Sequence, residues 1–289
     1  MTESFRPRAV TAAPTPTDAA GVRRSYVRFA ALGDSVTHGI GDPLRDGNRG
    51  WARILAGAML EAHDVSLCNL ARPGAGAADV RSAQLTDALD HRPHLASLVV
   101  GLNDTLRSSW DAYQVRADLL HTAERLAAQG VLLLTVRFHD HSRVLRLPGL
   151  LARPMRQRIE VLNQIYDEIH EQYDGVQVDL TGHPGVYDRE FWSIDRLHPS
   201  ELGHRALAEE FAALLEDRGF AFAGPGLDLD GLHVSRWGEV RWLGSVVVPW
   251  LGRRIVDLAP VAAAALLRFL LRLGRRRAPI RVRDVSASV

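Results

Sequence analysis

The chain has 289 residues, of which 46% are hydrophobic and 24% are charged, and its formal net charge is +1 at neutral pH. These values are ordinary for a globular protein that can bury a full core, and the length allows one large domain, alone or with an appendage. The single cysteine, Cys68, excludes an internal disulfide and implies no oxidising compartment.

The N-terminal segment, MTESFRPRAVTAAPTPTDAAG, is rich in Pro, Ala and Thr. It lacks the apolar stretch that a secretory signal needs. We therefore predict that residues 1–25 form a disordered lead and that the protein is cytoplasmic, with membrane association left open by the C-terminal region described below.

Apolar runs and helical patterns alternate from residue 26 onward. Strands are predicted at residues 26–32, 65–70, 95–100, 131–136 and 176–180. Helices are predicted near residues 50–62, 77–90, 111–129, 154–173 and 200–217. This alternation predicts an α/β fold in which helices cover both faces of a parallel sheet, and we assign it to one domain at residues 26–224.

Polar residues and glycines that can take part in catalysis follow four of the five predicted strands. Ser35 comes after the first strand, Gly74 after the second and Asn103 after the third, and Asp195 and His198 lie in the long loop after the fifth. Ligands of doubly wound sheets bind outside the carboxyl ends of the strands. We therefore expect these residues to converge at that edge.

Asp195 and His198 are three residues apart, just before a predicted helix start at Pro199 and Ser200. On a tight turn, this spacing lets the carboxylate accept a hydrogen bond from His198 Nδ1, so that Nε2 faces the serine. A serine hydroxyl is a weak nucleophile until a base takes its proton. The pattern therefore predicts Ser35 as nucleophile, His198 as base and Asp195 as the group that orients the imidazole.

An attacked ester carbonyl becomes an oxyanion, which needs hydrogen-bond donors already in place. Three donors are predicted: the backbone N–H of Ser35, the backbone N–H of Gly74 and the side-chain amide of Asn103. A glycine at position 74 would let the backbone approach the substrate closely.

Four short blocks give the chain a family resemblance. They are Gly33-Asp34-Ser35, Gly74 five residues after Asn69, Gly101-Leu102-Asn103-Asp104, and Asp195-Arg196-Leu197-His198. Over residues 26–218 the chain resembles the SGNH/GDSL hydrolases, and a stretch like VRWLGSVVVPWLGRR recurs in some bacterial members. The resemblance implies a three-layer α/β/α sandwich with a five-stranded, flavodoxin-like parallel sheet. It also implies hydrolysis of esters, from acyl lipids to acetylated sugars, without a metal or an organic cofactor.

Several polar residues receive other interpretations. Many family members have Glu where this chain has His38, so the resemblance does not transfer a substrate preference. Asp34 and Asp104 are predicted to support loops through hydrogen bonds, and His204 is predicted to be a packed or surface histidine without a catalytic role.

Three other functions compete with ester hydrolysis. The first is a metal site in the sequence FHDHS (His139, Asp140, His141). It is disfavoured, because alternate residues of an extended loop point in opposite directions and no third ligand is evident. A substrate-facing or solvated loop is preferred. A dinucleotide-binding turn at PGAGAADV is disfavoured, because Asp79 would bring negative charge near a pyrophosphate. The remaining alternative is a catalytically inert module of the same fold that binds acylated or glycan ligands.

The C-terminal region differs in charge from the rest of the chain. Residues 225–289 hold 11 Arg and 5 acidic residues, against 24 Arg and 29 acidic residues before them. We predict a basic Trp/Arg-rich appendage with an amphipathic helix near residues 258–273. Its interrupting arginines disfavour a membrane-spanning helix, so residues 255–289 are predicted either to dock on the domain or a partner, or to bind an anionic membrane peripherally. Nucleic acid is disfavoured, because the basic cluster has no interleaved aromatic residues.

Overall fold

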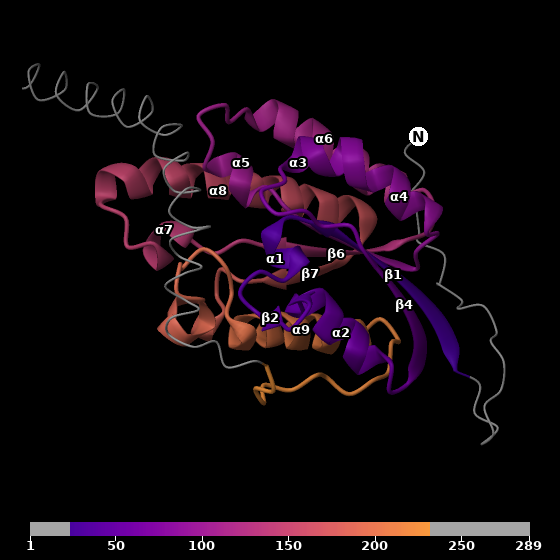
Figure 1. Ribbon diagram of the computed structural model, residues 1–289. Coiled ribbons are helices and arrows are strands. Elements are labelled where there is room, and N and C mark those ends of the chain that lie inside the picture. The colour runs from indigo at the N-terminus through magenta and orange to yellow at the C-terminus, as the bar shows by residue number, and fades with distance from the viewer. Residues whose placement is uncertain (1–23, 232–289) are drawn as a thin grey trace, which may run out of the picture.

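The computed structural model describes residues 24–231 of the chain (Figure 1). Most of the predicted N-terminal lead lies outside these residues. So do the predicted helix near residues 258–273 and the Trp-containing segment at residues 240–254.

The centre of the domain is a five-stranded parallel sheet with the strand order β4-β1-β5-β6-β7. Its strands are β1 (Ser25–Gly33), β4 (His63–Asn69), β5 (Leu95–Val99), β6 (Leu132–Arg137) and β7 (Val176–Asp179). The order reverses at β1, because the next strand along the chain, β4, lies on one side of it and β5 lies on the other. The predicted flavodoxin-like sheet is confirmed.

Helices cover both faces of the sheet, as Figure 1 shows. On one face lie α2 (Gly50–Met59) and α9 (Glu201–Glu216). On the other face lie α3 (Ala77–Asp79), η1 (Val80–Gln84), α4 (Leu85–Asp90), α6 (Ala112–Ala127) and α8 (Gly149–Tyr173). The three-layer arrangement is therefore the predicted one.

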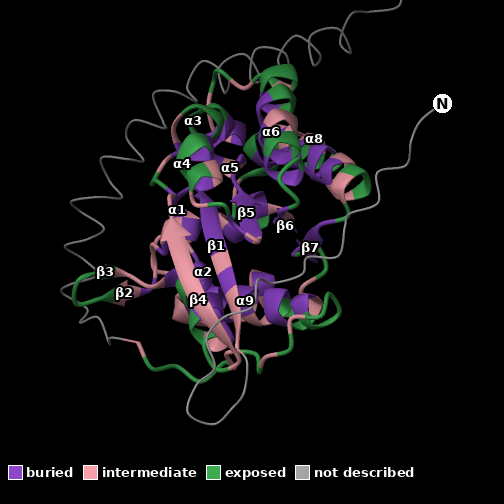
Figure 2. Ribbon diagram, turned by 90° about the vertical axis from the view of Figure 1, so that its right-hand side faces the viewer, coloured by how far each residue is buried: buried purple, intermediate pink, exposed green. Residues whose placement is uncertain are grey.

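Burial follows the position of each strand in the sheet. Every residue of β5 is buried, whereas every residue of the edge strand β4 is only partly buried (Figure 2). A strand covered on both faces reads as a continuous apolar run, which is why LASLV was recognisable. Between the sheet and the helices, Trp51 of α2 stacks on Phe211 of α9 with ring centroids 4.8 Å apart.

The structure corrects the helix predicted at residues 77–90. This segment consists of α3, the π-helical turn η1 and α4. Gln84 ends the wide turn, and its buried side chain forms two hydrogen bonds with β1: Gly33 N donates to Oε1 and Nε2 donates to Gly33 O, both at 2.9 Å. Such a turn inserts a residue into a helix, and here it accompanies a polar link between helix and sheet.

The structure also extends the helix predicted at residues 154–173, since α8 begins at Gly149 and contains Pro154. Proline lacks the N–H that would bond the carbonyl four residues earlier. That carbonyl belongs to Leu150, an exposed residue in the first turn of α8.

Short elements complete the edge of the sheet where the candidate site lies. They are α1 (Ser35–His38), β2 (Pro43–Leu44), β3 (Gly47–Asn48), α5 (Leu102–Thr105), α7 (His141–Val144), η2 (Pro184–Tyr187) and η3 (Arg189–Phe191).

Candidate active site

Ser35 is the first residue of α1, directly after β1. Asp34 caps this helix, because its Oδ1 accepts a hydrogen bond from Val36 N at 3.0 Å. The helix ends at Gly39, which has a φ of 100° and lies so close to Gly50 that a Cβ on Gly50 would be 2.3 Å from Gly39 Cα. Two glycines thus let the turn after Ser35 pack against the start of α2.

Three predicted residues form a hydrogen-bonded chain. His198 Nδ1 donates to Asp195 Oδ2 at 2.6 Å, and Ser35 Oγ donates to His198 Nε2 at 3.0 Å. Ser35 and His198 are 163 positions apart in sequence. The geometry allows His198 to accept the proton of Ser35 Oγ when the oxygen attacks a carbonyl.

The Asp195 carboxylate is held in place on both oxygens. Oδ1 accepts from Leu197 N at 2.9 Å and from His198 N at 3.2 Å, while Oδ2 faces the imidazole. Burial alone would raise the pKa of Asp195, but the hydrogen bond and the charge of His198 outweigh it and lower this pKa. The carboxylate therefore stays charged, which fixes the proton of His198 on Nδ1.

Two backbone N–H groups at the site donate to no acceptor among residues 24–231: those of Ser35 and Gly74. Gly74 has a φ of 79°, a conformation that favours glycine. Its carbonyl accepts a hydrogen bond from Arg107 Nη2 at 2.7 Å, and this bond helps to fix the backbone at Gly74. These are the two backbone donors that the sequence predicts for an oxyanion.

Asn103 lies at the site, but its amide already has two acceptors. Nδ2 donates to Asp34 Oδ2 at 3.2 Å and to Ala75 O at 3.1 Å, and the side chain is buried. In this arrangement Asn103 links the Asp34–Ser35 turn to the loop that carries Gly74. To serve as the predicted third oxyanion donor, the amide has to give up or share one of these bonds.

Asp34 and Asp104 act in loop support, as expected. Burial raises the pKa of Asp34 to about 6, against the opposing effects of the Val36 hydrogen bond and of His198. Asp104 Oδ2 accepts from Ala77 N at 3.1 Å, and its Oδ1 would lie 2.5 Å from a Cβ on Gly76. Gly76 is therefore a glycine because Asp104 occupies the space of a side chain.

The prediction for the FHDHS loop, a substrate-facing or solvated loop with imidazoles on opposite sides, is wrong. His139 and His141 are both buried, and His139 Nε2 lies 2.8 Å from His141 Nδ1. Both rings pack on Trp192, with centroids 4.9 and 5.0 Å from it. Burial lowers the pKa of both histidines, that of His141 to about 4, so the pair is neutral.

The turn between α1 and α2 is braced by residues that sequence reasoning did not assign to the site. Asp42 is fully buried, and Arg49 donates to its carboxylate through Nε at 2.8 Å and to Glu201 Oε1 through Nη2 at 2.8 Å. Glu201 opens α9, three positions after His198. Arg49 thus ties the turn after Ser35 to the helix that follows His198.

His204, in α9, makes further contacts with the turn between α1 and α2 and with the start of α2. Its Nδ1 accepts from Trp51 N at 3.2 Å, and its Nε2 donates to Ile40 O at 3.0 Å. Burial lowers the pKa of His204 to about 4. The prediction left a packed or a surface position open, and His204 is packed. Its position among the apolar residues of α9 could have indicated a buried hydrogen-bonding group.

Residues at the start of the predicted appendage contact Arg49, Glu201 and Arg205. Asp230 N and Gly231 N both donate to Glu201 Oε1 at 2.8 Å. The Asp230 carboxylate pairs with Arg49 and Arg205. Asp230 and Gly231 therefore lie beside the start of α9.

His38, the departure from the family pattern, hydrogen-bonds through Nδ1 to Ala71 O at 3.1 Å. In the PGAGAADV turn, Asp79 Oδ2 accepts from Gly76 N at 2.8 Å, so a carboxylate occupies the helix start that a dinucleotide phosphate would need.

No group of three or more His, Cys, Asp or Glu side chains that could hold a metal ion occurs between residues 24 and 231. None of the helices in that range combines the length and the apolar character that a membrane crossing needs.

Comparison with known proteins identified one protein family and a set of similar folds. The model of the GDSL-like Lipase/Acylhydrolase family matches residues 31–206. The search of curated proteins gave no match.

Three crystal structures illustrate the similar folds. TesA shares 20% identity over 66% of this chain and 99% of its own, with a TM-score of 0.52. The psychrotrophic esterase EstA from Pseudoalteromonas sp. shares 15% identity over 66% of this chain and 97% of its own, with a TM-score of 0.53. A catalytic mutant of Axe2, an acetylxylan esterase from Geobacillus stearothermophilus, shares 17% identity over 65% of this chain and 94% of its own, with a TM-score of 0.53. At these identities the likeness concerns the fold alone.

Proposed function

Because the chain belongs to the GDSL-like lipase/acylhydrolase family, we propose that it is a serine hydrolase that cleaves carboxylic esters through an acyl-enzyme on Ser35. The observation that carries this proposal is the hydrogen-bonded chain from Asp195 through His198 to Ser35. A merely structural serine has no need of an oriented imidazole at its hydroxyl.

The reaction proceeds in two halves. His198 Nε2 takes the proton of Ser35 Oγ as the oxygen attacks the ester carbonyl, and the resulting oxyanion accepts hydrogen bonds from the N–H groups of Ser35 and Gly74. The imidazolium then protonates the leaving alcohol, which leaves the acyl group on Ser35. In the second half, His198 activates a water that attacks the acyl-enzyme, and Ser35 recovers its proton.

The substrate class is an acyl or acetyl ester of a lipid, a sugar or a small molecule. Support comes from the family description and from similar folds that include esterases, one of them an acetylxylan esterase. The hydrolase unit is residues 26–224, and the mechanism uses no metal or organic cofactor.

The test is hydrolysis of p-nitrophenyl acetate together with labelling by a fluorophosphonate probe. The wild-type protein should hydrolyse the ester and take the label, and Ser35→Ala should lose both. Ser82→Ala, at an exposed serine of η1, is the matched control and should keep both. Hydrolysis by Ser35→Ala at the wild-type rate would remove Ser35 as the nucleophile. Absence of both hydrolysis and labelling in the wild type would favour the inert binding module.

We further propose that residues 255–289 mediate peripheral contact with anionic membranes. The proposal rests on the basic, amphipathic sequence of this segment. Deletion of residues 255–289 should abolish pelleting with anionic vesicles while p-nitrophenyl acetate hydrolysis continues. Equal pelleting of the full-length and shortened proteins would contradict the proposal.

A further inference from the structure

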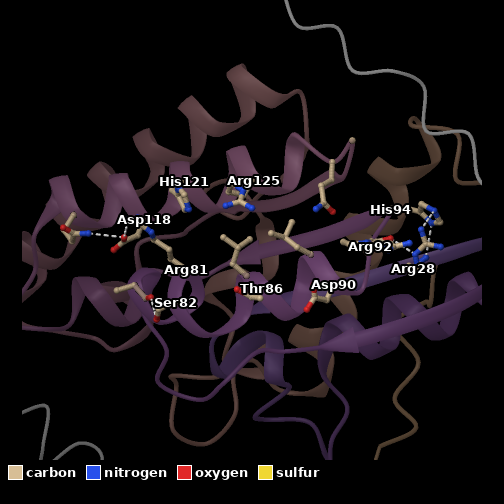
Figure 3. A pocket seen from close by; sticks show the side chains of 17 residues that line it. Arg28, Arg81, Ser82, Thr86, Asp90, Arg92, His94, Asp118, His121 and Arg125 are labelled. Atoms are coloured by element: carbon tan, nitrogen blue, oxygen red, sulfur yellow. Dashed lines mark hydrogen bonds and ion pairs between the residues drawn. The ribbon is translucent and has the colours of Figure 1, made fainter.

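A second concave surface lies away from Ser35. It is a groove of about 1240 Å³ between η1–α4 and α6 (Figure 3). Arg28 of β1 and residues 92–94, before β5, line one end of it. None of the residues assigned above to the Ser35 site lines this groove.

The groove is positive in a domain that is otherwise acidic. It is lined by four arginines and two aspartates: Arg28, Arg81, Arg92, Arg125, Asp90 and Asp118. Arg81 Nη1 pairs with Asp118 Oδ1 at 2.9 Å, which neutralises that carboxylate. Three guanidinium groups then remain against the single carboxylate of Asp90. Residues 1–224 as a whole hold more acidic residues than arginines, so this positive charge is local.

Several donors in the groove lack acceptors. The guanidinium groups of Arg92 and Arg125 form no hydrogen bond or ion pair with any residue from 24 to 231. The same holds for the side chains of Thr86, His121 and Gln129. In Figure 3, His121 and Arg125 lie along the α6 wall and Thr86 lies on the α4 wall, so these donors line both sides of one space.

At the end of the groove, two donors meet. His94 Nδ1 accepts a hydrogen bond from Arg28 N at 3.1 Å, which places the proton of the neutral ring on Nε2. His94 Nε2 lies 3.1 Å from Arg28 Nη2, which is also a donor (Figure 3). Burial and the charge of Arg28 lower the pKa of His94, so the ring stays neutral. An anion beside this pair would accept from both groups.

We propose that this groove binds a small multivalent anion that carries phosphate groups. A guanidinium presents its N–H groups in a planar fork that matches phosphate oxygens, and imidazole, hydroxyl and amide groups supply neutral donors beside it. An acyl chain does not suit a groove lined by arginines. Nucleic acid does not suit it either, because three unneutralised cations supply few phosphate contacts.

Isothermal titration calorimetry with inorganic tripolyphosphate tests the proposal on the full-length protein at about 50 mM NaCl. The wild type should bind saturably, with one tripolyphosphate per chain. The double variant Arg92→Gln, Arg125→Gln should bind at least about tenfold more weakly, because each lost guanidinium removes charge-assisted hydrogen bonds. Arg153→Gln, at an exposed arginine of α8 that does not line the groove, should bind like the wild type. Lack of saturable binding by the wild type, or equal weakening in Arg153→Gln, would overturn the proposal.

A second arm distinguishes the source of the phosphate. Vesicles that contain phosphatidic acid present the same group as a lipid headgroup. Residues 255–289, proposed above to bind anionic membranes, are present in both proteins, so the readout is the difference in pelleting between the wild type and the double variant. If the double variant loses tripolyphosphate binding and also pellets less completely than the wild type, the ligand is a lipid headgroup. If it loses tripolyphosphate binding and pellets as the wild type does, the ligand is a soluble phosphate compound. Vesicle binding by a wild type that does not bind tripolyphosphate contradicts the proposal. Hydrolysis of p-nitrophenyl acetate should be unchanged in both variants, which separates this test from that of the proposed function.

Discussion

His204 offers a prediction whose size follows directly from its burial. The imidazole is neutral and fully buried, and burial lowers its pKa from the ordinary 6.5 to about 4. As the pH falls below about 6.5, the unfolded chain binds a proton at this histidine while the folded chain does not. The stability that neutral His204 contributes is therefore complete above pH 6.5 and is lost progressively down to about pH 4.

Linkage converts this shift into a free energy. A difference of one pKa unit corresponds to about 1.4 kcal/mol, so the whole window corresponds to about 3 kcal/mol. Between pH 7 and pH 5, the free energy of unfolding should fall by about 2 kcal/mol through this residue alone. His204→Gln keeps an acceptor for Trp51 N and a donor for Ile40 O but does not titrate.

Urea denaturation at pH 7 and pH 5, followed by tryptophan fluorescence, measures the effect. The loss of stability between the two pH values should be about 2 kcal/mol smaller in His204→Gln than in the wild type. His141→Gln is a second, independent variant, because burial lowers the pKa of His141 to about 4 as well. Equal losses in the wild type and in both variants would refute the assignment of neutral buried imidazoles.

Three further substitutions, one of them with a control substitution, probe the residues around the proposed oxyanion donors. Asn103→Ala should lower kcat about 10²–10³-fold if the amide reaches the oxyanion; a lower stability with unchanged kcat would show that it only supports the loop. Gly76→Ala should reduce kcat and stability together, because the added Cβ would lie 2.5 Å from Asp104 Oδ1. The control is Gly57→Ala, whose added Cβ would have no atom within 4 Å. This control should leave stability unchanged or raise it by up to about 1 kcal/mol. Arg107→Met should lower kcat more than it changes KM, since Arg107 holds the Gly74 carbonyl; an unchanged kcat in a p-nitrophenyl acetate assay would rule out this positioning role.

The fold was predictable because its signals are local. Each strand of the five-stranded sheet appears as a short apolar run, and the observed bounds of these strands differ from the predicted ones by at most two residues. The two-residue strands β2 and β3 carry no such run and no prediction covers them. The convergence of Ser35, Asp195 and His198 followed from a rule about sheet edges that needs no knowledge of side-chain packing. The helix predicted at residues 154–173 begins five residues too late, because proline favours the first turn of a helix, whereas Pro154 lies inside α8.

The contacts around the site were less predictable because they depend on partners distant in sequence. Arg49 and Glu201 are 152 positions apart, and Asn103 and Asp34 are 69 apart. The histidine pair was misjudged for a local reason. Asp140 accepts from Ser142 N at 3.1 Å and caps α7, so the backbone turns between His139 and His141 and brings the two rings together. The assumption of an extended loop, with alternate residues on opposite sides, fails at a helix cap.

The buried titratable groups near Ser35 act in opposite senses on stability. Asp34 has a pKa raised to about 6 by burial, so the folded chain binds its proton first and gains stability as the pH falls from about 6 to about 4. His204 and His141, each with a pKa of about 4, lose stability over nearly the same window. Each histidine shift is at least as large as that of Asp34, and His139 adds to the loss. The three histidines together therefore outweigh Asp34. Mild acid destabilises the contacts of His204 with Trp51 and Ile40 and the packing of His139 and His141 on Trp192.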